Sequence, residues 1–190
     1  MLSEQRILDI FSTTGVMLEG HFKLTSGRHS DKYMQFARLF EYPEYSQMLC
    51  AELASRFTDV DIVAGPALGG IIMAYEVSRA LGARNVFAER EDGVLTLRRG
   101  FEIPKDANVL CVEDVVTTGG SVKELLGILH ICGANPVGVA AIVDRSGGQV
   151  DFGVRFESVY RAVITSYPED KCPLCEQGIP VVKPGSRVIQ

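Results

Sequence analysis

Apolar and polar positions alternate with helical and strand periods along the chain, and this pattern predicts most of its secondary structure. An amphipathic run that follows Ser3 predicts a first helix, with apolar residues at Ile7, Leu8, Ile10 and Phe11. Residues 21–36 read as two strand-like pieces separated by Ser26-Gly27. Residues 42–57, YPEYSQMLCAELASRF, predict a second helix.

An apolar strand followed by a polar turn then appears three times. Residues 61–82 give a strand, a Gly/Pro turn and a helix that Gly82 would end. Residues 109–133 have the same order and close at Gly133, and residues 136–148 add another strand of the buried type. Near-continuous apolar strands that alternate with helices predict an α/β fold, a parallel sheet flanked by helices. In such a sheet, ligands bind beyond the carboxyl ends of the strands, where all three polar turns lie.

The segments outside these units are shorter and richer in turns. Residues 85–103 contain two alternating runs around Asp92-Gly93, a dipeptide that favours a tight β-hairpin. Residues 167–190 are rich in turn-forming residues, and we expect them to end the domain. No linker or low-complexity tract divides the chain, so one domain over residues 1–190 is expected.

Composition and charge narrow the possible functions. The chain has 190 residues, is 46% apolar and 23% charged, and carries a net charge of −5. This balance offers no basic face for nucleic acid, so local groups must hold any bound anion. No segment reaches the roughly 20 apolar residues that a membrane span needs, and charges interrupt the apolar N-terminus, so a cytoplasmic protein is expected. Five cysteines without a secretion signal argue against a disulfide framework.

The most informative stretch is VLCVEDVVTTGGS, residues 109–121. An apolar strand ends in Glu113 and Asp114, and a turn of hydroxyl and glycine residues follows, Thr117-Thr118-Gly119-Gly120-Ser121. Backbone N–H groups of such a turn at a helix N-terminus hold an anion well. Two carboxylates would repel a bare phosphate, but they accept hydrogen bonds from vicinal hydroxyls or bind Mg²⁺ through water. The stretch therefore suits a ribose phosphate, although a plain glycine-rich turn between strand and helix is the simpler alternative.

A second glycine-rich turn lies at residues 64–70, AGPALGG. By itself it is equally well read as a packing turn. Beside a ribose phosphate site, it could hold a second phosphate cluster. A ribose with phosphate at both ends is phosphoribosyl pyrophosphate, which becomes the candidate substrate.

The stretch at residues 109–121 resembles the signature of the type I phosphoribosyltransferases. Four further segments, LTSGRHSDKYMQ, AGPALGG, FAERE…LRRGF and VDRSGG, follow in the order of the orotate phosphoribosyltransferases, so the resemblance covers about residues 20–150. It implies a three-layer α/β fold with a small N-terminal hood from about residues 1–40. It also implies transfer of ribose 5-phosphate from phosphoribosyl pyrophosphate to orotate, Mg²⁺ held mainly by that substrate, and a homodimer whose mobile loop enters the partner's site.

The resemblance assigns roles to individual residues. Glu113, Asp114 and Arg90, the last in the loop at residues 89–99, are expected to be catalytic. Arg145 is expected to hold the orotate carboxylate, because its guanidinium forms a planar bidentate fork. The expected substrate-binding residues are Val115, Val116, Thr117, Thr118, Gly119, Gly120, Ser121, Arg145, Ser26, Gly27, Ala67, Leu68, Gly69 and Gly70. Ser26 and Gly27 would face the pyrimidine edge, and Tyr33 would either stack on it or belong to the core.

Some features depart from the family or leave alternatives open. Thr25 stands where better-known members have a lysine, and residues 89–99 lack the usual lysine and histidine. Cys172-Pro-Leu-Cys175 is half of a zinc site, but the histidines, His21, His29 and His130, are scattered along the sequence, so no protein-bound metal is predicted. The competing functions are a phosphoribosyltransferase for another base, a non-catalytic sensor of phosphoribosyl pyrophosphate, and a redox or metal protein.

Overall fold

A six-stranded, mostly parallel sheet forms the centre of the protein. The computed structural model describes residues 1–24, 26–162 and 165–184. The strand order is β5-β4-β3-β6-β7-β8, and every pair is parallel except β4–β5. The strands are β3 (Ile62–Pro66), β4 (Arg84–Glu91), β5 (Val94–Leu97), β6 (Asn108–Val116), β7 (Asn135–Asp144) and β8 (Phe156–Arg161). The strands that follow β3 are added on one side, toward β5, whereas those that follow β6 are added on the other side, toward β8. Such a switch point between β3 and β6 leaves a crevice for ligands.

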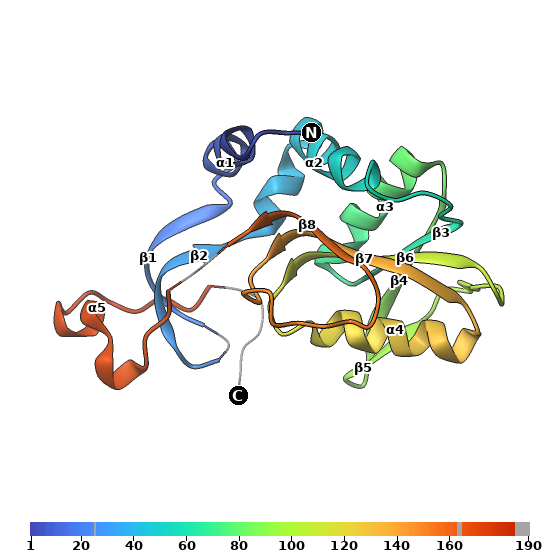
Figure 1. Ribbon diagram of the computed structural model, residues 1–190. Coiled ribbons are helices and arrows are strands. Elements are labelled where there is room, and N and C mark those ends of the chain that lie inside the picture. The colour runs from blue at the N-terminus through green and yellow to red at the C-terminus, as the bar shows by residue number, and fades with distance from the viewer. Residues whose placement is uncertain (25, 163–164, 185–190) are drawn as a thin grey trace.

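Helices cover both faces of this sheet and make it the middle of three layers (Figure 1). One face carries α2 (Pro43–Ala54) and α3 (Gly69–Leu81), and its core contains Leu53, Met73 and Leu110. The other face carries α4 (Gly120–Cys132), and its core contains Leu125 and Leu129. The central strands are apolar on both sides because both sides are buried, as expected for a parallel sheet.

The N-terminal segment forms the hood, which consists of α1 (Glu4–Thr13), β1 (Met17–Lys23), β2 (His29–Met34) and the 3₁₀ helix η1 (Phe36–Glu41). Strands β1 and β2 form a separate antiparallel pair. The C-terminal segment returns to this pair with a 3₁₀ turn, η2 (Glu169–Lys171), and a short helix, α5 (Pro173–Glu176), which lies beside β1 (Figure 1). The hood is therefore built from both ends of the chain.

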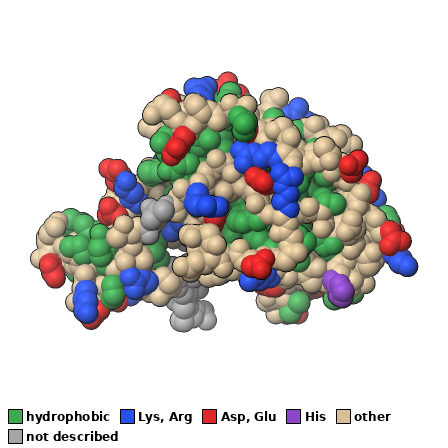
Figure 2. Space-filling view, viewed as in Figure 1, with side chains coloured by type: hydrophobic (Ala, Val, Ile, Leu, Met, Phe, Trp, Pro, Cys, Tyr) green, Lys and Arg blue, Asp and Glu red, His purple; other side chains and the backbone are tan. Residues whose placement is uncertain are grey.

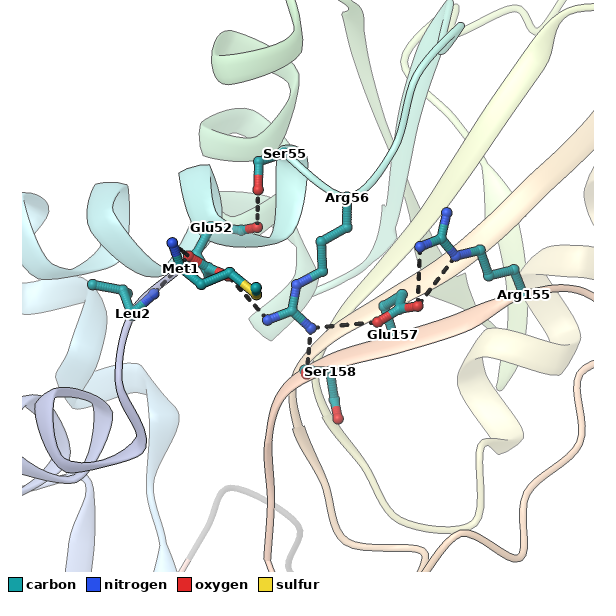
Figure 3. A network of polar contacts seen from close by, with 8 residues as sticks. All are labelled: Met1, Leu2, Glu52, Ser55, Arg56, Arg155, Glu157 and Ser158. Atoms are coloured by element: carbon teal, nitrogen blue, oxygen red, sulfur yellow. Dashed lines mark hydrogen bonds and ion pairs between the residues drawn. The ribbon is translucent and has the colours of Figure 1, made fainter.

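A polar network fastens the beginning of the chain to the sheet (Figure 3). Glu52, at the end of α2, accepts hydrogen bonds from the Leu2 N–H at 2.9 Å and from Arg56 Nη2 at 3.1 Å. Arg56 Nη1 also donates to the carbonyl of Ser158 on β8 at 3.0 Å and pairs with Glu157 at 3.3 Å. One arginine thus links α2, β8 and the segment that leads into α1.

The distribution of charged side chains on the surface agrees with the low net charge. Acidic and basic side chains lie interspersed over the face in Figure 2. Among the described residues, no helix is long and apolar enough to cross a membrane.

Most of the elements expected from the sequence are confirmed. Ser3 caps α1 by accepting the Arg6 N–H at 3.2 Å, and Gly82 and Gly133 end α3 and α4 in the left-handed conformation. Asp92-Gly93 forms the turn between β4 and β5 with φ of 50° and 85°. Strand β8 and the return of residues 165–183 to the hood were not predicted, and Thr25 lies outside the described residues.

Candidate active site

The predicted phosphate loop lies at the carboxyl end of β6, in the centre of the sheet. Glu113 and Asp114 belong to β6 itself, and their side chains are half-buried. Residues 117–119 leave the strand, and α4 begins at Gly120. Gly119 has φ of 73°, and a β-carbon there would press on Phe152 and Val150 at 2.8 Å, so only glycine fits this turn. The N-terminus of a 13-residue helix therefore points at the end of β6.

The second predicted loop, residues 67–70 after β3, lies against the first. A β-carbon at Gly69 would collide with the carboxylate of Asp114. The Ala67 N–H donates to the carbonyl of Ala88 at 2.7 Å, which fixes the loop to β4. The peptide bond between Ala67 and Leu68 is cis, and the Leu68 side chain is exposed. Both loops thus meet at the switch point between β3 and β6.

Burial raises the pKa of both acids of β6. Burial raises the pKa of Glu113 to about 9, and the negative charge of Asp114 adds to this shift. Burial also raises the pKa of Asp114, while hydrogen bonds from the Val115 N–H at 2.7 Å and from the Glu113 side chain act in the opposite direction. Glu113 therefore favours its protonated form near neutral pH.

Arg145 follows β7 and lies next to the end of β6. Its N–H donates to the carbonyl of Val116 at 2.8 Å. Burial lowers the pKa of Arg145, and the nearby Tyr33 partly offsets that effect. Its Nε is buried and has no hydrogen-bond partner among the described residues. Tyr33 comes from β2 of the hood, so hood and sheet meet at this arginine.

Asp144 shapes the turn that carries Arg145. Its buried carboxylate accepts the Ser146 N–H at 2.8 Å and the Ser146 hydroxyl at 2.6 Å through Oδ1. Its Oδ2 accepts Arg161 Nε at 3.1 Å. Asp144 thus satisfies neighbouring groups of its own chain and positions the turn.

The remaining predicted residues lie in two other places. Ser26 and Gly27 are exposed on the loop between β1 and β2, where the Gly27 N–H donates to the carbonyl of Leu24 at 2.9 Å. Arg90 lies on the β4–β5 hairpin and is held by Glu124 of α4, with two nitrogen–oxygen distances of 2.8 and 2.9 Å. In this structure Arg90 is thus paired with a residue of its own chain, on α4, the helix that follows the phosphate loop.

The expectation of scattered histidines is wrong for two of them. His21 and His29 are buried in the hood, and His21 Nε2 lies 2.9 Å from His29 Nδ1. His29 is 1% exposed, so it does not lie at the surface. Given the turn at Ser26-Gly27, the two-residue period of an antiparallel pair could have placed both rings on one face.

Comparison with known proteins places this geometry in a family. Residues 44–152 match the model of the phosphoribosyl transferase domain. The orotate phosphoribosyltransferase of Thermoanaerobacter sp. (strain X514) is 55% identical over 188 residues, which are 98% of this chain and 99% of that protein. The chain belongs to the orotate phosphoribosyltransferase family. The orotate phosphoribosyltransferase of Thermotoga maritima (strain MSB8) is also 55% identical, over 183 residues, which are 95% of this chain and 98% of that protein.

Solved structures of the orotate phosphoribosyltransferase family share the fold. The crystal structure of the Aeropyrum pernix enzyme has a TM-score of 0.71 at 26% identity and covers 82% of this chain and 93% of its own. The three-layer fold with a hood, expected from the resemblance, is therefore confirmed. Since the matched domain spans residues 44–152, the hood and the C-terminal segment lie outside that part of the chain.

Proposed function

We propose that this protein transfers ribose 5-phosphate from phosphoribosyl pyrophosphate to orotate, giving orotidine 5′-phosphate and pyrophosphate in the pathway to UMP. The observation that carries the proposal is the meeting of the acid pair on β6, the N-terminus of α4 and the loop after β3 at one switch point. Identity of 55% to orotate phosphoribosyltransferases over nearly the whole chain supports it. The proposed compartment is the cytoplasm.

Each part of phosphoribosyl pyrophosphate has a matching element. Backbone N–H groups and hydroxyls of residues 115–121 would hold the 5′-phosphate at the N-terminus of α4. Asp114 and Glu113 would accept hydrogen bonds from the ribose 2′ and 3′ hydroxyls. Residues 67–70 would hold the pyrophosphate, because their backbone lies directly against Asp114.

The acid pair would act on the ribose as its bond to pyrophosphate breaks. The anomeric carbon becomes cationic while negative charge grows on the leaving group. As a carboxylate, Asp114 would stabilise the cationic ribose through the hydroxyls. Carboxylate oxygens suit Mg²⁺, so Asp114 and Glu113 fit the ion that the family uses. Bound Mg²⁺ would neutralise charge on the pyrophosphate, which is its main ligand.

Arg145 would select the base. Orotate differs from uracil by a carboxylate, and a buried carboxylate requires a partner. The buried Nε of Arg145 has no partner among the described residues, and Tyr33 of the hood acts on the pKa of its guanidinium. Ser26 and Gly27 of the hood loop would complete the pocket from the other side.

The test is the loss of orotate absorbance in a mixture with phosphoribosyl pyrophosphate and Mg²⁺. Turnover with orotate, and little with uracil, adenine, guanine or hypoxanthine, is expected. Arg155→Ala serves as a control for surface charge, because that arginine is exposed, is paired with Glu157 of β8 and lies outside the predicted substrate loops. Preferred turnover of a purine would replace orotate by another base, and binding of phosphoribosyl pyrophosphate without turnover of any base would favour the sensor.

The proposed assembly is a homodimer in which the β4–β5 hairpin serves the partner's site. Leu68, Ile72 and Tyr75 support it, since they form an exposed apolar stripe beside the site at helical spacing. In a dimer, mixing Arg90→Ala chains with Asp114→Asn chains should raise activity above that of either variant alone, because some hybrid sites receive both intact groups. No recovery after verified subunit exchange would exclude shared sites, with Arg155→Ala, an ion-paired arginine outside the apolar stripe, as the control.

A further inference from the structure

Four metal-ligating side chains converge in the hood, away from the acid pair. They are His21 of β1, His29 of β2, Cys172 and Cys175. Cys172 directly precedes the short helix α5, and Cys175 lies within it. Their ligand atoms all lie within 4.8 Å of one another. The first three residues are buried and Cys175 is exposed, so the cluster lies under the surface with one ligand facing solvent.

The separations match the edges of a coordination tetrahedron. Zinc bonds of about 2.0–2.1 Å to nitrogen and 2.3 Å to sulfur give ideal edges of roughly 3.3 Å between nitrogens and 3.6 Å between nitrogen and sulfur. The two histidine nitrogens are 2.9 Å apart. His21 Nε2 lies 3.5 Å from Cys172 Sγ and 3.7 Å from Cys175 Sγ, and His29 Nδ1 lies 3.3 Å from Cys175 Sγ. All four sets of lone pairs thus face one small volume.

The groups around the cluster prepare His21 for a metal. His21 Nδ1 lies 2.7 Å from the carbonyl of Ile179 and donates to it, which leaves a lone pair on Nε2 facing the cluster. Gly178, with φ of 68°, turns the chain after α5 so that this carbonyl reaches the ring. His29 Nε2 is buried without a hydrogen-bond partner among the described residues, so His29 is the less firmly oriented of the two.

Backbone pairing holds the two cysteines against the two histidines. The N–H of His29 donates to Tyr167 and the N–H of Tyr167 donates to His29, both at 2.8 Å. The Val182 N–H donates to the carbonyl of His21 at 2.8 Å. These pairs flank the CPLC turn on both sides, so the approach of His21 to Cys172 across 151 positions is part of the fold.

We propose that His21 Nε2, His29 Nδ1, Cys172 Sγ and Cys175 Sγ bind one Zn²⁺ ion as a closed structural site. Two thiolates and two imidazoles suit zinc, whereas Mg²⁺ and Ca²⁺ prefer oxygen ligands. Four protein ligands leave no position for substrate, which indicates a structural ion. Binding releases the thiol protons to solvent, and two thiolates then balance the charge of the ion, so the buried centre is neutral.

A Cys172–Cys175 disulfide is the competing use of these residues. It would explain the two sulfurs but not the two imidazole nitrogens that face them. The other cysteines differ, because Cys111 and Cys50 are buried thiols whose pKa burial raises to about 12. They are small apolar residues of the core and not candidate ligands.

The ion would have a positioning role, and this part rests on the proposed function. His21 and His29 stand on either side of residues 24–28, the loop that carries Ser26 and Gly27. Zinc would join both ends of this loop to the C-terminal segment. A loop held at both ends keeps the orotate side of the pocket in place, whereas the sites for phosphoribosyl pyrophosphate lie on β3, β6 and α4.

The first experiment measures metal in the full-length protein produced with zinc in the medium. About one zinc per chain is expected, and the stripped protein should bind Co²⁺ with tetrahedral ligand-field bands and a sulfur-to-cobalt charge-transfer band. Cys175→Ser, at an exposed position, and His21→Gln should each lower zinc affinity by more than about 100-fold, the upper end of the cost of losing an outer-shell partner. His130→Gln and Cys132→Ser, both on α4 and outside the cluster, should keep the ion.

The outcomes separate the two uses of the cysteines. A protein that binds neither Zn²⁺ nor Co²⁺ when reduced, or that keeps zinc in both Cys175→Ser and His21→Gln, overturns the site. Tight zinc binding that ends with either ligand variant supports it, and a metal-free protein with a native Cys172–Cys175 disulfide overturns it. None of these readouts depends on enzymatic activity.

The second experiment tests the positioning role with saturating Mg²⁺. Cys175→Ser should raise the KM for orotate roughly three- to tenfold, because a misplaced recognition loop weakens binding. Its KM for phosphoribosyl pyrophosphate should stay the same, as should both constants of His130→Gln. Loss of zinc with unchanged orotate KM overturns the positioning role. If the wild-type protein does not turn over orotate, the proposed function fails while the metal measurement still decides the site.

Discussion

The candidate active site and the hood are built in opposite ways. At the carboxyl end of β6, Glu113, Asp114 and residues 115–121 are contiguous in sequence, and one strand and one helix position them all. In the hood, the Cys/His cluster joins residues up to 154 positions apart, and backbone pairing of the two chain ends brings them together. The first kind of site is visible as a motif, whereas the second exists only after long-range pairing. This difference predicts that changes in the two regions have separable effects.

The largest expected effect is that of Asp114→Asn. If Asp114 binds a ribose hydroxyl while charged, its replacement removes roughly 1.5–3 kcal/mol, about 10- to 150-fold in kcat/KM for phosphoribosyl pyrophosphate. Steady-state kinetics measure this loss, and zinc content should equal that of the wild type. Kinetics that match the wild type would show that Asp114 does not take part in ribose recognition. Joint loss of activity and zinc would show that the two regions do not respond separately.

The second test is Gly69→Ala, because a β-carbon there would collide with the Asp114 carboxylate. Overpacking of this kind costs about 1–3 kcal/mol in the free energy of unfolding, and a displaced Asp114 should also raise the KM for phosphoribosyl pyrophosphate. Gly127→Ala is the matched control. It lies inside α4 with nothing within 4 Å of an added β-carbon, and it should stabilise by about 0.5–1 kcal/mol. Equal effects of the two changes in urea unfolding would show that Gly69 has no special contact.

Arg145→Gln tests whether the binding of orotate can be changed separately from the binding of phosphoribosyl pyrophosphate. The KM for orotate should rise at least about tenfold, the equivalent of roughly 1.4 kcal/mol, because the charged partner of the carboxylate is lost. The KM for phosphoribosyl pyrophosphate should change little, since its phosphates lie on the loops after β3 and β6. Equal damage to both substrates, or unimpaired use of orotate, would mean that Arg145 does not bind the carboxylate.

The last test concerns stability, and its effect has the opposite sign. Because the pKa of Glu113 is raised to about 9, the folded chain binds this proton while the unfolded chain releases it near pH 4.3. The wild type therefore loses stability as pH rises from the unfolded pKa toward 9. Glu113→Gln mimics the protonated acid, so at pH 7 it should be more stable by at least about 1.4 kcal/mol, one pKa unit.

The control for this effect is its pH dependence. The advantage of Glu113→Gln in urea unfolding should vanish below about pH 4, where the acid is protonated in both states. Glu157→Gln, on the arginine-paired acid of β8, should show no such gain at pH 7. A constant difference from pH 4 to pH 8 would show that the proton on Glu113 is not its cause.

The sequence predicts the local features of the molecule and misses those that depend on long-range packing. Helix caps, the Asp92-Gly93 turn and the phosphate loop are local, since neighbouring residues determine φ angles and hydrogen bonds there. The state of Glu113 was not predicted, because its pKa depends on burial between two strands and a helix. The approach of Cys172 to His21 depends on a bulge between Glu19 and Phe22 and on a tail that has no strand period.

The return of the C-terminal segment has a consequence for synthesis on the ribosome. Ser30 Oγ donates to the carbonyl of Thr165, a partner 135 positions later in the chain. At roughly 5–20 residues per second, the β1–β2 hairpin waits on the order of ten seconds for this partner. An isolated two-stranded hairpin is only marginally stable in water. The hood is therefore among the first parts of the molecule to be made, but it stays incomplete until residues 165–183 have been synthesised.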